Sequence, residues 1–167
     1  MAKQGIVADL IDGAIAGALA TWMMGKVTTV LYESENKAAR RREDEARKGK
    51  TAYAVAAEKA AALSRTQLSK EESERYGSAI HWGLGIGAGA LYGALRSRFE
   101  SASLARGLAF GTTFWLLMDE GAVYALGLTP GPRAFPWQTH ARGLAGHLTF
   151  GAVADATLDV LQPAARL

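Results

Sequence analysis

The sequence predicts an all-α integral membrane protein: a bundle of about four transmembrane helices with a charged helical insert between the first two. Charge is segregated, because residues 33–75 hold 20 of the 35 charged residues and the flanking segments are nearly uncharged. Glycine also recurs at helical spacing in those apolar segments. Each such glycine would weaken a helix in water by about 1 kcal/mol, whereas in lipid it lets a second helix approach closely. The hydrophobic content of 49% does not reveal this segregation, because it averages the charged insert with the apolar segments.

Four apolar segments are long enough to be transmembrane helices, since about 20 helical residues cross the ~30 Å hydrocarbon core. They cover residues 5–32, 77–95, 107–128 and 139–161. The second segment has no formally charged residue, and Pro130 and Pro132 end the third, because proline cannot continue a helix cheaply. A glycine-rich soluble four-helix protein is the alternative.

The polar insert, residues 33–76, is either a solvated helical hairpin or partly disordered. Ser69 and Glu72 have the spacing of a capping box, so a helix is expected to begin there and run into the second apolar segment. Thr139 is the expected cap of the fourth segment, and Trp82 and Trp137 lie where interfacial aromatic residues are expected.

The distribution of Lys and Arg predicts the orientation. Four spans place the insert on one side of the membrane and both termini on the other, with 13 Lys and Arg on the insert side against 5. The positive-inside rule then places residues 33–75 in the cytoplasm of a multi-pass protein. Basic residues far from a helix end weaken this inference.

Ionisable residues inside predicted spans are candidates for function. One set is expected near the insert end of the bundle: Lys26, His81, Asp119, Glu120 and His147. These residues are interpreted either as a proton or ion site or as structural ion pairs, with Lys26 bonded to Asp119 or Glu120. A local helix break at Glu120 and Gly121 is a further interpretation.

Two other sets of residues are assigned structural roles. Interfacial ion pairs are expected at the end that carries the termini, from Asp9, Asp12, Arg96, Arg98, Arg106, Asp155 and Asp159. A four-carboxylate cation site is the less favoured interpretation there. Helix packing is assigned to Gly13, Gly17, Gly85, Gly89 and Gly93.

Several classes of function lack support in the sequence. The chain has no cysteine, which excludes a disulfide framework, a thiol nucleophile and a Cys-ligated metal site. Two histidines and two carboxylates are a plausible ligand set for a divalent transition metal, the less favoured interpretation, but their spacing matches no metal-binding motif. No metal is assigned, and no cofactor is indicated. The net charge of +3 is too small and too mixed to indicate nucleic acid. No nucleophile elbow or phosphate-binding loop is found, so we expect a protein that is not an enzyme.

The residues from Asp119 to His147 resemble one known family. The similarity rests on Asp119-Glu120-Gly121, Leu126-Gly127-Leu128, Pro130-Gly131-Pro132, Phe135-Pro136-Trp137, Thr139-His140, and Arg142-Gly143-Leu144 with Gly146-His147. This pattern, together with residues 13–27, resembles the YagU-like bacterial inner-membrane proteins, a family with a domain of unknown function. The resemblance implies a bacterial inner-membrane location and supplies no catalytic residues.

Two functions remain open. In the first, the Asp119, Glu120 and His147 layer handles protons or ions, in connection with pH stress. In the second, the protein is a structural or accessory subunit, and its glycine faces pack against copies of itself or another membrane protein. Both expect the lipid bilayer as surroundings and a homo-oligomer or larger membrane complex as the assembly.

Overall fold

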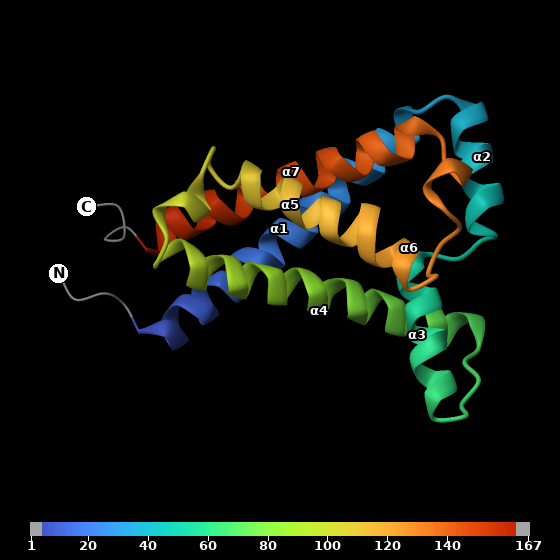
Figure 1. Ribbon diagram of the computed structural model, residues 1–167, viewed down its shortest axis with the longest axis horizontal. Helices are drawn as coiled ribbons and strands as arrows, with labels where there is room; N and C mark the ends of the chain where they lie inside the picture. The colour runs from blue at the N-terminus through green and yellow to red at the C-terminus, as the bar shows by residue number, and fades with distance from the viewer. Residues whose placement is uncertain (1–4, 163–167) are drawn as a thin grey trace.

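The computed structural model describes residues 5–162, and all regular structure within that range is helical. Four long segments form an elongated bundle, in which the start of α1 and the end of α7 lie at the same end (Figure 1). The segments are α1 (Ile6–Ser34), α4 (Lys70–Arg96), α7 (Trp137–Leu161) and a composite third segment. The third segment consists of α5 (Leu108–Leu117), a π turn (Met118–Ala122) and α6 (Val123–Ala125).

The insert forms two helices at the other end of the bundle (Figure 1). They are α2 (Lys37–Arg47) and α3 (Ala52–Leu63), capped by Asn36 and Thr51 respectively. Short 3-10 turns (Glu100–Ser103 and Pro132–Ala134) lie in the two remaining connections. Because α3 packs along the first turns of α4, the insert covers one end of the bundle.

Helix α1 is central and packs against both α4 and α7. Its contact with α4 is backbone against backbone: a Cβ atom added at Gly89 would lie 2.3 Å from the Cα of Gly17. Gly13 and Gly93 are equally confined by the backbone of the facing helix, and Gly85 lies against the side chain of Thr21. The five packing glycines therefore join two helices of one chain.

Glycine also allows the third segment to approach α7. A Cβ atom at Gly111 would lie 2.2 Å from the carbonyl oxygen of His147, and one at Gly151 would lie 2.2 Å from that of Gly107. Gly107, with φ +78°, adopts the left-handed conformation that glycine accepts without strain, and α5 begins directly after it. Close packing at this point brings the third segment against α7 at the level of His147.

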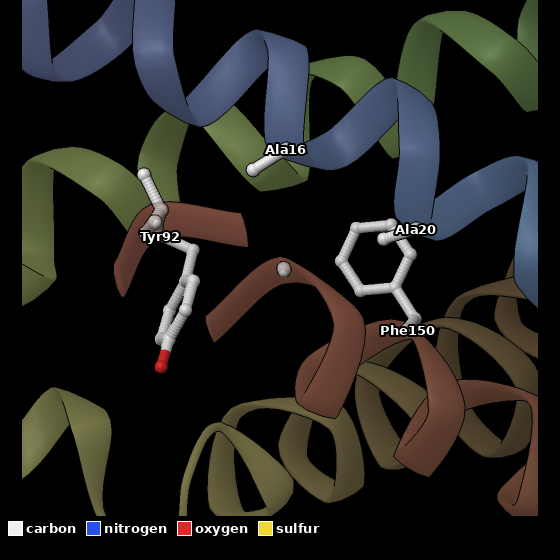
Figure 2. Close-up of a cluster of buried hydrophobic side chains, with 6 residues drawn as sticks. Ala16, Ala20, Tyr92 and Phe150 are labelled. Carbon is white, nitrogen blue, oxygen red and sulfur yellow. The ribbon is translucent and has the colours of Figure 1, made fainter. Parts of the chain in front are cut away.

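The interior of the bundle contains small and aromatic side chains. Ala16 and Ala20 of α1 face Tyr92 of α4 and Phe150 of α7, and all four are fully buried (Figure 2). Phe110 and Phe114 of α5 extend this cluster, with ring centroids 4.6 Å apart for Tyr92 and Phe110 and 5.6 Å apart for Phe114 and Phe150. The aromatic rings thus fill the middle of the bundle.

Many large apolar side chains are exposed on the surface of the bundle. They occur on every long segment: Ile11, Ile15, Leu19, Trp22, Leu84, Leu91, Leu116, Leu117, Trp137 and Val160 are all exposed. Charged side chains, by contrast, are buried: Asp9, Glu43, Arg96, Arg142 and Asp155 are each at most 9% exposed. Such a surface is stable where the surroundings are apolar or another protein covers it.

Among the described helices, α1 is the one that is long and apolar enough to cross a membrane by length and composition. This test is weak evidence by itself, because the core helix of a soluble protein passes it too. The other described segments lack a helix that is both long and apolar enough, for visible reasons. α4 begins with the charged residues 70–75, the third segment is interrupted after ten residues of α5, and α7 carries buried ionisable residues.

The helix termini agree with the sequence in part. The Ser69–Glu72 capping box is present with both of its hydrogen bonds, so α4 begins seven residues before the predicted span. The fourth segment begins at Trp137 after Pro136, and Thr139 is not its cap. The hydroxyl of Thr139 instead donates to Glu43 of the insert at 2.8 Å, a partner that local spacing could not indicate.

Candidate functional site

A polar cavity of about 270 Å³ lies at the insert end of the bundle, among α1, α3, α4, the third segment and α7. Its ionisable wall is formed by Arg47, His81, Asp119, Glu120, His140 and Arg142. Its apolar and aromatic wall includes Met24, Tyr53, Trp115, Val123, Tyr124 and Phe135. The cavity therefore brings together three of the predicted site residues with several that the sequence did not single out.

Asp119 and Glu120 belong to the π turn, in which the N–H of Val123 bonds to the carbonyl of Met118 five residues earlier. Such a turn inserts one extra residue into an α-helix and recurs at functional sites. Both consecutive carboxylates consequently line the same cavity. The sequence had suggested a helix break here; the structure shows a widened turn that continues into α6.

Glu120 is paired with His140, which the sequence analysis did not select. The Nδ1 atom of His140 lies 2.6 Å from Oε1 of Glu120, and its Nε2 lies 3.2 Å from the carbonyl oxygen of Pro132. A carbonyl only accepts, so the network assigns a proton to Nε2. The Nδ1–Oε1 contact places the imidazole and the carboxylate within hydrogen-bond distance of each other.

Asp119 lies close to His147, but the two side chains are farther apart than Glu120 and His140 are. Its Oδ2 atom is 3.7 Å from Nδ1 of His147, which instead donates to the carbonyl of Gly143 at 3.0 Å. The His147 ring is buried and meets Phe114 edge-on, with centroids 5.1 Å apart. His147 therefore lies where the polar cavity meets the aromatic interior.

Gly143 provides the space that Asp119 occupies. A Cβ atom at this position would lie 3.0 Å from Oδ2 of Asp119 and 3.1 Å from Nε1 of Trp115. The absence of a side chain on α7 thus lets the carboxylate and the indole N–H reach the same place. Gly143 was part of the family resemblance but had no assigned role.

His81 and Lys26 differ in their placement. The His81 ring lies 4.8 Å from that of Tyr53, and both side chains line the cavity. Burial, with a contribution from Asp119, raises the pKa of the Tyr53 hydroxyl to about 12. Lys26 is exposed, with its ammonium 5.9 Å from the centroid of Trp22, so it does not form the expected ion pair with Asp119 or Glu120. Its place on the outer face of α1 explains the difference.

A buried ion network joins α2 to α7 beside the cavity. Arg142 donates to both carboxylate oxygens of Glu43, at 2.6 and 2.5 Å, and also to Glu35. Arg47 bonds to Glu43 at 2.7 Å. Burial alone raises the pKa of Glu43, but the Arg142 bonds, with Arg47 and Thr139, outweigh it and hold the pKa below its usual value. Arg47 and Glu43 are four residues apart on α2, but only the fold brings Arg142 to Glu43, so this buried network could not be predicted from local spacing.

The opposite end of the bundle contains a second set of ion pairs. Arg96 bonds to Asp155 at 2.8 Å and to Asp159, and Arg98 bonds to Asp9 at 2.9 Å. These contacts join α4 and the turn after it to α7 and α1. The Tyr92 hydroxyl also donates to Asp155, at 2.7 Å.

The remaining two residues assigned to that end are placed differently. Asp12 accepts a hydrogen bond from the amide of Gln162 at 3.2 Å. Arg106 is exposed and has a positive φ of 55° in the turn before α5. Asp12 thus belongs to the α1–α7 contact, whereas Arg106 is a turn residue.

Neither a metal-ligand cluster nor a known relative identifies the site. Within residues 5–162, no cluster of three or more His, Asp or Glu side chains is arranged to hold a metal ion. The chain matches no family model, and no curated protein or solved structure matches it. The chemistry of the cavity must therefore be argued from its own residues.

Proposed function

We propose that the protein is a membrane-embedded four-helix bundle that handles protons through the cavity at its insert end. The observation that carries this proposal is the Glu120–His140 pair, a carboxylate and an imidazole in hydrogen-bond contact at 2.6 Å. Both side chains are partly exposed, at 22% and 25%, so the pair is within reach of solvent, as proton exchange requires. Ionisable groups of this kind inside a membrane bundle are the usual parts of a proton relay.

The placement of side chains supports the membrane. Exposed Ile, Leu, Val and Trp side chains cover all four long segments, while glycine, alanine and paired charges lie inside. At 1.5 Å per residue, α7 is about 37 Å long and the third segment about 27 Å, which is close to the ~30 Å hydrocarbon thickness. Glycine contacts between helices are also typical of membrane bundles.

A relay can be traced inward from the cavity. Asp119 and His147 form the next carboxylate–imidazole pair, and His147 adjoins the aromatic cluster. Phe114, Phe150, Phe110 and Tyr92 then separate this polar end from Asp155 and Arg96. We infer a gated path rather than an open pore, since a proton must pass this cluster of rings to cross.

The proposed setting follows from the sequence. The positive-inside count favours the cytoplasmic side for the insert and the cavity. The bacterial inner membrane is part of the proposal through the family resemblance. Membership of the YagU-like family is part of the same proposal and rests on the resemblance of residues 119–147. A cavity that exchanges protons with the cytoplasm suits a role in pH stress.

Proton flux in reconstituted vesicles tests the proposal. A pH gradient is imposed, and its decay is followed with an enclosed pH-sensitive dye. We expect the protein to accelerate the decay, Glu120→Gln to abolish that acceleration, and Glu74→Gln to preserve it, because Glu74 is an exposed residue paired only loosely with Lys70, at 3.9 Å. Equal rates for the protein and Glu120→Gln, with both folded, would refute the relay.

An accessory role is the second candidate, and one observation favours it. Gly83 and Gly87 of α4 have nothing within 4 Å of an added Cβ atom, so this glycine face is open to another helix. A homo-oligomer or a complex with another membrane protein would cover it. Gly83→Leu should then reduce the native mass measured in mild detergent, whereas an unchanged mass would remove this support.

A further inference from the structure

We propose that the cavity binds a small organic monocation with an apolar body, anchored by the carboxylate of Asp119. This inference rests on the proposed membrane bundle and specifies a ligand for the same cavity. A proton alone leaves most of the cavity unused, since about 270 Å³ corresponds to roughly nine water molecules at ~30 Å³ each. The space suits a ligand of several non-hydrogen atoms.

The two walls of the cavity differ in character. Tyr53, Trp115, Tyr124 and Phe135 form an aromatic side, and Met24 and Val123 add apolar surface. Aromatic faces attract cations, most strongly where water is excluded. A ligand with an apolar body and one cationic head matches such a lining better than a hydrated metal ion does.

The charges beside the cavity favour a cation. Arg47 and Arg142 are both bonded to Glu43, and Arg142 also to Glu35, so these basic groups are neutralised within the network. Glu120 is bonded to His140. Asp119 has the weaker contact, 3.7 Å to a ring nitrogen that donates elsewhere, and it is 32% exposed. Its carboxylate remains able to accept hydrogen bonds from an ammonium group.

A second observation also points to a ligand. Two buried polar atoms of cavity-lining residues have no hydrogen-bond partner: Oγ1 of Thr129 and Nε1 of Trp115. Buried polar atoms are rarely left unpaired, and each such case requires an explanation. The Thr129 oxygen can accept a second N–H of the ammonium head. The indole N–H of Trp115 lies beside the same point of Gly143 as the Asp119 carboxylate, so it is near the proposed anchor.

The experiment is calorimetric titration of the purified full chain in detergent micelles with n-butylammonium chloride. Sodium chloride at the same ionic strength controls for salt, and 1-butanol is the neutral ligand of matched shape. We expect saturable binding of butylammonium and none of sodium. Asp119→Asn should weaken binding at least about tenfold, because a hydrogen bond to a charged group is lost. The exposed Glu74→Gln serves as the matched control and should bind like the parent protein.

Thr129→Val provides a second variant if Asp119→Asn does not fold, as judged by helical circular dichroism. It should weaken binding about fivefold, the value of one ordinary hydrogen bond. Equal binding of butanol and butylammonium would overturn the inference, as would unchanged binding in a folded Asp119→Asn or Thr129→Val. Proton flux that persists and still depends on Glu120 would show that only the ligand assignment fails.

Discussion

A Cβ atom on Gly89 of α4 would lie 2.3 Å from the Cα atom of Gly17 on α1, so these helices cross with their backbones in contact. Even an alanine at position 89 must therefore push the helices apart. In membrane bundles this close contact provides the van der Waals energy that lipid cannot provide through a hydrophobic effect. The pair accordingly determines how tightly α1 and α4 associate within one chain.

Gly89→Ala should lower the free energy of unfolding by about 1–3 kcal/mol, the usual cost of overpacking. Gly87→Ala is the matched control on the same helix, because nothing lies within 4 Å of its added Cβ atom. The free energy of unfolding of this control variant should equal that of the parent protein or be slightly higher, because alanine favours the helical conformation more than glycine does. Unfolding of both variants by sodium dodecyl sulfate in mixed micelles measures the difference. An effect of Gly89→Ala confined to oligomer dissociation would contradict the intramolecular assignment.

The buried Glu43–Arg142 pair should be essential for attachment of the insert to α7. In Glu43→Gln, the buried Arg142 guanidinium faces a neutral amide where the parent protein has a carboxylate. Breaking a buried ion pair of this kind lowers the free energy of unfolding by about 3–5 kcal/mol. Because the network flanks the cavity, α2 should also loosen. Hydrogen exchange of α2 amides, with thermal unfolding, measures both effects. Glu45→Gln, in an exposed pair with Arg41, should change little, and equal effects of the two variants would contradict the role of burial.

The stabilisation from Glu43 should depend on pH in one direction. Its pKa is lowered in the folded state, so its contribution is fully present above the ordinary value of 4.5 and is lost as the pH falls through the lowered folded pKa. The difference in midpoint temperature between the parent protein and Glu43→Gln should thus be constant above about pH 5.5 and shrink below about pH 4.5. A difference that grows on acidification would contradict the assignment.

Local patterns in the sequence predicted the helices, and the reason is physical. Apolar length and glycine spacing are encoded within each segment, as are caps such as Ser69 with Glu72. The cavity was predicted in part. Asp119, Glu120 and His147 were placed at one level by counting residues, but the partner of Glu120 was missed. His140 lies in the first turn of α7, 20 residues after Glu120, and local spacing does not indicate that these two side chains meet.

Contacts between segments far apart in the chain were not predictable. Glu43 lies 99 residues from Arg142, and nothing in the mixed-charge insert distinguishes it from its exposed neighbours. The predicted ion pair of Lys26 was wrong for a different reason. Depth along a helix can be counted, but the face that a residue occupies depends on which neighbours the helix packs against, and α1 directs Lys26 outward.

The exposed apolar side chains should be inaccessible from water in the native membrane. The chain has no cysteine, so a single introduced cysteine is the one thiol that a maleimide can label. Ile15→Cys of α1 and Leu91→Cys of α4 are exposed on the isolated bundle, and we expect neither to react with a membrane-impermeant maleimide in vesicles. Glu45→Cys on α2, which is exposed outside the bundle, should react rapidly when the insert side faces the reagent.

The same experiment distinguishes lipid from a soluble fold. In a soluble protein, all three positions would react at comparable rates, because exposure to water alone would decide reactivity. Protection of Ile15→Cys and Leu91→Cys that disappears on addition of detergent and mild denaturant would indicate lipid or helix contacts over both faces. Rapid labelling of Leu91→Cys in intact vesicles would exclude α4 as a span. The four-helix membrane bundle, and with it the membrane-facing proton path, would then have to be abandoned.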